Sequence, residues 1–223
     1  MVRVWFVTGS SRGVGRVLAE KVLESGDIVV ATSRNPSQLG DLVTKYGSDK
    51  VFAISLDVTD FDQANKAAVV PIMRQQKSGH IIQVSSIGGR IGTPGAAAYQ
   101  SAKWAVGGFS TVLSKEVAPF GIKVTVAEPT GINTNMGATA TDNSKVSEPY
   151  EQTVGQIIQL ISKEYSGWTG VSEIARAIIH LSNVEYPPLR IILGKDALQK
   201  AEMVAKTLAE SDEKWTKVSK LEF

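Results

Sequence analysis

The chain has no cysteine and only two histidines, His80 and His180. The absence of cysteine excludes disulfides and thiolate metal sites. No other metal-ligating residues cluster around either histidine, so we expect no metal site. The formal net charge is only +2, and the basic residues are scattered along the chain. This excess is too small for a nucleic-acid-binding surface, so we expect no nucleic-acid partner.

Long hydrophobic runs are also missing. The opening residues VRVWFVTG are apolar but too few for a signal peptide or a membrane span. We therefore expect a cytoplasmic protein without a membrane span. The 223 residues, 43% hydrophobic and 21% charged, suffice for one domain with a sizeable core, and we assign residues 1–223 to a single domain.

Apolar segments typical of strands alternate with segments typical of helices. We expect strands at 2–9, 27–33, 51–57, 80–86, 122–129 and 188–194, and helices at 13–26, 96–119, 172–182 and about 195–219. Continuous apolar strands separated by helices are typical of a parallel sheet that is covered on both faces. The sequence therefore predicts an α/β fold with a doubly wound parallel sheet. The polar segment 132–149 is expected to be a loop that shapes a substrate pocket.

The first strand leads into a glycine-rich turn, TGSSRGVG, from Thr8 to Gly15. Glycines allow a tight turn and a close approach of the backbone to a pyrophosphate, and the helix that begins near Gly13 directs its free N–H groups at the phosphates. A plain strand–helix turn is the structural alternative. The strand before, the helix after and the next strand together favour a Rossmann-like dinucleotide site.

The end of the second strand bears on the choice of dinucleotide. An acidic residue there would hold the ribose 2′-hydroxyl of NAD, but this chain has Ser33 followed by Arg34, and Arg12 lies in the glycine turn. Two guanidinium groups suit a 2′-phosphate. The alternative is a pair of solvated surface arginines. We therefore predict NADP(H), with Asp57 after the third strand as an acceptor for the adenine amino group.

The segment YQSAK places Tyr99 and Lys103 on one face of a helix, because they are four residues apart. A free tyrosine has a pKa of about 10, and a neighbouring ammonium lowers that pKa by roughly 1–3 units. Ser86 lies at the end of a strand, where ligands collect in parallel sheets. A Tyr–Lys pair alone is usually an ordinary surface pair. Together with Ser86, the glycine turn and EPTG at 128–131, it indicates a catalytic pair.

These motifs together resemble the short-chain dehydrogenase/reductase family, from residue 1 to about 135 with one break. The tail PPLRIILGKDAL resembles, more loosely, hydroxysteroid- and retinol-dehydrogenase-like members. The resemblance implies an NADP(H)-dependent oxidoreductase that moves hydride between nicotinamide and a small-molecule alcohol or carbonyl substrate. It is also compatible with a homo-oligomer.

By the same resemblance, Ser86 hydrogen-bonds the substrate oxygen, Tyr99 exchanges its proton, and Lys103 holds the nicotinamide ribose and tunes Tyr99. Besides Tyr99 and Lys103, the cofactor-binding residues implied are Gly9, Ser11, Arg12, Gly13, Val14, Gly15, Ser33, Arg34, Asp57, Val58, Pro129 and Thr134.

The break lies near Val70–Pro71. The resemblance implies a further strand and helix between Asp57 and Ser86, and one such unit needs roughly 30 residues. The chain there has room for one crossover rather than two. One fused helix across Pro71 is an option. The strand 80–86 then either moves beside the first strand or leaves a hole in the sheet, which is costlier because backbone N–H and C=O groups stay unpaired.

The expected function is therefore an oxidoreductase whose activity is reduced by an internal deletion. The alternatives are a non-catalytic dinucleotide-binding protein and an inactive truncated variant.

Overall fold

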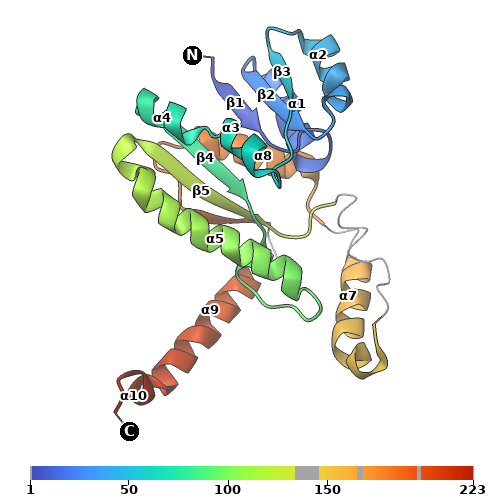
Figure 1. Ribbon diagram of the computed structural model, residues 1–223. Coiled ribbons are helices and arrows are strands. Elements are labelled where there is room, and N and C mark those ends of the chain that lie inside the picture. The colour runs from blue at the N-terminus through green and yellow to red at the C-terminus, as the bar shows by residue number, and fades with distance from the viewer. Residues whose placement is uncertain (1, 134–145, 165–167, 195–196, 223) are drawn as a thin grey trace.

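The computed structural model describes residues 2–133, 146–164, 168–194 and 197–222. It has an α/β fold of parallel sheets flanked by helices (Figure 1), as the sequence predicts. The first sheet has the order β1-β2-β3 and the second β4-β5-β6. The strands are β1 (Val4–Val7), β2 (Ile28–Ser33), β3 (Val51–Ser55), β4 (Gly79–Val84), β5 (Ile122–Pro129) and β6 (Arg190–Leu193).

Helices connect these strands and cover the sheets. They are α1 (Gly13–Glu24), α2 (Gly40–Tyr46), α3 (Phe61–Lys66), α4 (Val70–Gln76), α5 (Ala97–Val117), α7 (Gln156–Glu164), α8 (Val171–Ser182), α9 (Ala197–Lys214) and α10 (Thr216–Ser219). The expected C-terminal helix is thus α9 and α10, and α9 projects away from the sheets (Figure 1). None of the helices in the described part of the chain is long and apolar enough to cross a membrane.

The strands form two separate parallel sheets rather than one continuous sheet. β1 and β4 are the inner edges of the two sheets, and within the described residues they do not pair with each other. Of the two expected arrangements, β4 beside β1 or a gap between them, the structure therefore has the gap. The split falls between the 3-2-1 half and the 4-5-6 half of a doubly wound order, which is the switch point of such sheets.

Packing of α8 against α1 holds the two sheets together. Ile174, Ala175 and Ile178 of α8 belong to the same buried cluster as residues of β1, β2 and α1. Ile82 of β4 packs against that cluster, so both sheets contribute to one core. Arg3, next to β1, adds hydrogen bonds from its Nη1 to the side chains at the end of α8, at 3.1 Å to Ser182 Oγ and 2.8 Å to Asn183 Oδ1.

The segment at the break forms two short helices and not the single fused helix that was one option. α3 ends at Lys66, and Pro71 lies in the first turn of α4. Proline has no N–H and its ring clashes with the carbonyl four residues earlier, so it starts a helix more readily than it continues one. Met73 of α4 packs on the second core, around Val117, Ile122 and Val124.

Because His80 on β4 is partly buried in this packing, the packing can be tested by measuring folding stability at acid pH. Its Nε2 lies 2.9 Å from Thr125 Oγ1, and its buried Nδ1 has no partner among the described residues. Burial, and secondarily the charge of Lys123, lowers the pKa of His80 to about 4. The unfolded chain therefore binds a proton that the folded chain resists, and folding stability falls as the pH drops from about 6.5 to about 4.

We expect His80→Gln to flatten this part of the stability profile. The measurement is urea unfolding of both chains at several values of pH between 4 and 8. Above pH 7 the difference between the two chains should be constant. An unchanged slope between pH 6.5 and 4 in the variant would contradict the burial of a neutral His80.

Candidate dinucleotide and catalytic site

The glycine turn after β1 has the backbone that its sequence predicts. Gly9 and Gly13 have positive φ angles of 69° and 60°, which side chains other than glycine rarely adopt. At Gly15, a Cβ atom would lie 2.5 Å from the carbonyl oxygen of Gly9. Ser10 fixes the turn, since its Oγ donates to the Val7 carbonyl at 2.8 Å. The turn therefore leaves main-chain amides accessible at the start of α1.

The expected phosphate-binding arginines lie at this end of the first sheet. Arg12 precedes α1 and makes no side-chain capping bond, and Arg12 and Arg34 are both exposed. Within the described part of the chain, no ion pair engages either guanidinium. Ser33 is buried and donates to the Asn35 carbonyl at 2.6 Å, so it shapes the loop and does not present a free hydroxyl.

Asp57 follows β3 and lies near Arg34. Its Oδ1 accepts hydrogen bonds from Thr59 N at 2.9 Å and Thr59 Oγ1 at 2.8 Å. These bonds, and to a smaller extent the charge of Arg34, lower the pKa of Asp57, against a desolvation effect that raises it. Asp57 and the exposed Val58 follow β3, where we expect the adenine to bind. One oxygen of Asp57 already accepts hydrogen bonds from Thr59 within the turn.

The expected catalytic pair, Tyr99 and Lys103, lies on α5 beside the second sheet. Lys103 Nζ is 5.8 Å from the centroid of the Tyr99 ring, which confirms that both side chains share one helix face. The Tyr99 side chain is 44% exposed. Lys103 Nζ donates to the carbonyl oxygen of Val84, the last residue of β4, at 3.2 Å. Burial lowers the pKa of Lys103.

Ser86 is brought to Tyr99 by the short helix η2 (Ile87–Gly89). The Ser86 Oγ accepts a hydrogen bond from Gly88 N at 3.1 Å and so caps η2. Gly88 packs on α5, since a Cβ atom there would lie 3.4 Å from Tyr99 Cε1. The structure thus gathers Ser86, Tyr99 and Lys103 at one place, the carboxyl end of β4.

Glu128 is a site residue that the sequence reasoning did not identify. It is fully buried on β5, and its carboxylate accepts from Arg90 Nε at 2.5 Å and from Arg190 Nε at 2.9 Å. Arg190 Nη2 also donates to the Gly89 carbonyl at 3.1 Å. The ion cluster therefore clamps η2, and with it the loop of Ser86, to β5 and β6. An acidic residue inside the apolar strand 122–129 was the available signal.

The cofactor end and the catalytic end belong to different sheets. The glycine turn, the two arginines and Asp57 follow strands of the first sheet, whereas Ser86 follows β4, Tyr99 and Lys103 lie on α5, and Pro129 ends β5, all at the second sheet. Thr134 lies outside the described residues. Among the described residues there is no group of three or more His, Asp or Glu side chains that could hold a metal ion.

Comparison with known proteins supports the family resemblance that the motifs indicate. The family model described as short chain dehydrogenase matches residues 3–68 and 66–145, in two segments that meet between α3 and α4. The oxidoreductase BOA17 of Botryotinia fuckeliana (strain B05.10) is 44% identical over 270 aligned residues, covering 98% of both proteins. This alignment is longer than the 223-residue chain, so the relative carries residues with no counterpart here.

Solved structures of similar fold cover nearly the whole chain. A short-chain dehydrogenase from Streptomyces avermitilis has a TM-score of 0.84 at 30% identity and covers 99% of this chain and 98% of its own. A short-chain dehydrogenase/reductase from Burkholderia phymatum in complex with NAD has a TM-score of 0.77 at 15% identity, with coverages of 94% and 95%. A gluconate 5-dehydrogenase from Burkholderia cenocepacia J2315, in complex with NADP and tartrate, has a TM-score of 0.72 at 18% identity and covers 89% of this chain and 95% of its own.

The Glu128 cluster gives a prediction about stability. Glu128→Gln leaves two arginines facing a neutral buried amide, so we expect the free energy of unfolding to fall by about 3 kcal/mol. The control is Glu210→Gln, which removes an exposed carboxylate 3.8 Å from Lys206 and should change stability by less than about 0.5 kcal/mol. Equal effects in chemical denaturation would contradict the role of Glu128 as a clamp.

Proposed function

Because the chain belongs to the short-chain dehydrogenase family and is an oxidoreductase of that type, we propose that it transfers hydride between NADP(H) and a small alcohol or carbonyl substrate. The observation that carries this proposal is the gathering of Ser86, Tyr99 and Lys103 at the end of β4. There Lys103 Nζ lies 5.8 Å from the Tyr99 ring, and η2 connects Ser86 to that ring.

In the proposed mechanism each side chain has one task. Ser86 Oγ holds the substrate oxygen, and the Tyr99 hydroxyl gives it a proton during reduction or takes one during oxidation. Lys103, on the same helix face as Tyr99, holds the ribose of the nicotinamide. The nicotinamide, when bound, supplies or accepts the hydride. The exposed face of Tyr99 leaves room for a substrate at this point.

Preference for NADP(H) is proposed from the charges at the first sheet. Arg12 and Arg34 offer two exposed guanidinium groups, and the place of the acid that would select NAD is taken by Ser33. Similar folds are known with NAD and with NADP, so the argument depends on these arginines. A 2′-phosphate forms charge-assisted hydrogen bonds with guanidinium groups, whereas a 2′-hydroxyl gains little from them.

Loss of one strand–helix unit near Val70–Pro71 is the second part of the proposal. Three observations support it: the two-segment family match, the alignment with a 44%-identical relative that is longer than this chain, and two inner strands, β1 and β4, that do not pair with each other within the described residues. The cofactor would be anchored at the first sheet, while Ser86 and Tyr99 belong to the second. A misplacement of about 1 Å between reacting groups lowers rates roughly 100-fold, so we propose that turnover is strongly reduced.

A dinucleotide-binding protein without turnover is the second candidate function, and the split between the sheets favours it. The substrate and the proposed resemblance to hydroxysteroid and retinol dehydrogenases stay predictions, as do a cytoplasmic location and a homo-oligomer.

Cofactor choice is tested by titrating the protein with NADPH and NADH and following ligand fluorescence. We expect NADPH to bind more tightly, and Arg34→Ala to weaken NADPH binding about tenfold while leaving NADH binding nearly unchanged. Arg176→Ala, on the exposed side of α8, makes the same change of charge elsewhere and serves as control. Equal affinities for both cofactors would exclude the 2′-phosphate assignment.

Turnover is tested with the chain and with a chimera. We expect the chain to reduce a panel of carbonyls far below about 1 per second, the lower end of typical enzyme rates. A chimera that carries the extra residues of the Botryotinia relative between Val70 and Pro71 should regain activity.

Tyr99→Phe in the chimera should abolish the regained activity at an unchanged melting temperature. Tyr150→Phe, which alters another exposed tyrosine, should have no effect. Fast turnover of the unmodified chain would refute the proposed impairment, and activity that survives Tyr99→Phe would refute the proton transfer.

A further inference from the structure

The edges of β1 and β4 that face each other have backbone groups without a strand partner, and one of them, the Val84 carbonyl, accepts a hydrogen bond from the Lys103 side chain. Ser85 N donates to the Ala127 carbonyl of β5 at 2.8 Å, and Ile28 N of β2 donates to the Arg3 carbonyl at 2.9 Å. Alternate residues of a strand direct their N–H and C=O groups to opposite neighbours. Val84 and Ile82 of β4, and Val4 and Phe6 of β1, therefore direct theirs toward the space between the sheets.

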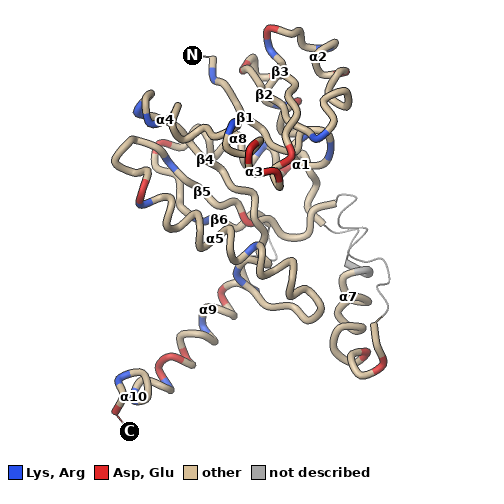
Figure 2. Tube along the Cα trace, in the orientation of Figure 1, with Lys and Arg blue, Asp and Glu red and all other residues tan. Residues whose placement is uncertain are grey.

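Neither strand contains a Lys, Arg, Asp or Glu residue. β1 reads VWFV and β4 reads GHIIQV, and Figure 2 shows both traces without acidic or basic residues. Proteins usually protect exposed edges with charged residues, prolines or a covering element, because unprotected edges pair with other chains. These two edges have none of those charges or prolines, and Val4 is 67% exposed.

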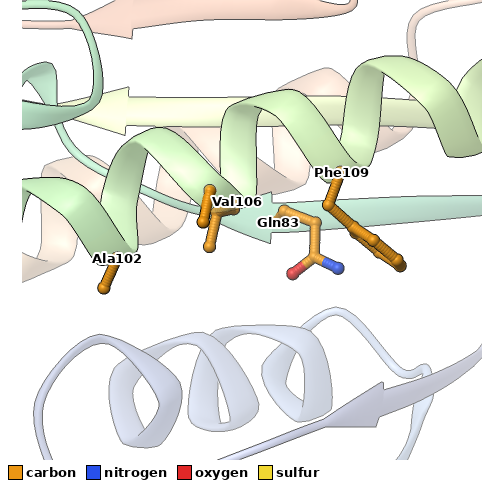
Figure 3. A pocket seen from close by; sticks show the side chains of 5 residues that line it. Gln83, Ala102, Val106 and Phe109 are labelled. Carbon is orange, nitrogen blue, oxygen red and sulfur yellow. The ribbon is translucent and has the colours of Figure 1, made fainter.

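A cavity lies beside the same gap. It measures about 250 Å³ and is lined by Gln83 of β4 and by Ala102, Ala105, Val106 and Phe109 of α5. In Figure 3 these side chains extend from α5 and β4 toward the pale blue ribbon of the N-terminal part of the chain. Phe109 is 61% exposed. The lining is apolar apart from Gln83, which suits the apolar face of a helix.

We propose that the gap between β1 and β4 is a strand-acceptor site that binds a separate apolar segment, a strand followed by a helix. The strand would pair in parallel with both edges, and the apolar face of the helix would cover the cavity on α5. A strand with partners on both sides is apolar along its whole length. This inference rests on the deletion proposed above: the occupant that fits is one strand–helix unit, and the 270-residue alignment with the 44%-identical relative leaves room for residues that this chain lacks.

Occupancy would change the catalytic pair. The Val84 carbonyl points into the gap, and Lys103 Nζ donates to it at 3.2 Å. An incoming strand would donate its own backbone N–H to that carbonyl. Lys103 would then be released toward Tyr99, whose ring it already approaches to 5.8 Å. The acceptor site is in this way coupled to the active site through one hydrogen bond.

The probe is a synthetic peptide with the sequence of the Botryotinia relative opposite the break, and the protein is the full chain. Hydrogen exchange with and without peptide is followed at single amides. We expect exchange to slow at least about tenfold at Val4, Phe6, Ile82 and Val84, which face the gap, and to stay unchanged at Trp5 and Ile81, which already face a partner strand. Uniform protection, or none, would overturn the proposal.

Two controls separate strand pairing from loose apolar contact. A peptide with proline in the middle of its strand loses hydrogen bonds and should bind at least about tenfold more weakly. Lys103→Met removes the side chain that competes for the Val84 carbonyl and should tighten peptide binding about two- to tenfold. Weaker binding by this variant would contradict the release of Lys103.

The outcomes distinguish this inference from the proposed function. An active chimera together with a peptide that does not bind would overturn the acceptor site and leave the function intact. Peptide binding with alternating protection, but no activity in the chimera, would support the acceptor site and refute the function. Alternating protection at β1 and β4 already present in the chain without peptide, with a dimer in sedimentation, would make a second copy the occupant and overturn the proposal.

Discussion

The contact between α8 and α1 is the constraint on which the structure depends. α8 follows β5 in the chain, yet Ile174, Ala175 and Ile178 are buried in the core of the first sheet. No strand within the described residues pairs across the middle of the fold, so this packing holds the sheets in place of a hydrogen-bond ladder. Apolar burial is strong but non-directional, whereas a ladder fixes register residue by residue. The two sheets are thus held together without strand register between them.

Each half of the site is nevertheless built locally. The glycine turn is fixed by its own backbone, with Gly15 against Gly9 and Ser10 tied to Val7. The loop of Ser86 is fixed by the buried carboxylate of Glu128 and its two arginines. In the proposed function, cofactor binding depends mainly on the first half and proton transfer mainly on the second. The proposed hydride transfer depends on both halves in register, so the proposed loss of a central strand affects this step most.

Lys103 contacts both the open edge of β4 and the proposed catalytic tyrosine, Tyr99. Its ammonium satisfies the Val84 carbonyl, an acceptor that an adjacent strand would otherwise bind. In this structure the bond holds Lys103 Nζ at the edge of β4, 5.8 Å from the centroid of the Tyr99 ring. The lysine of the proposed catalytic pair is thus also bonded to the open edge of the second sheet.

The sequence by itself determined the features that depend on neighbours along the chain. Four-residue spacing placed Tyr99 and Lys103 on one face, the glycine pattern set the turn before α1, and apolar runs gave parallel strands in an α/β fold. The tertiary structure alone decided that the sheets separate, that Pro71 starts a new helix, and that Glu128 clamps the Ser86 loop. Those outcomes depend on which distant groups find partners: Glu128 of β5 pairs with Arg190 of β6, whereas β1 and β4 each have a strand partner on one side only within the described residues. Periodicity along the chain records the faces of each element but not the pairing of its edges, because edge pairing is made by backbone groups that every residue shares.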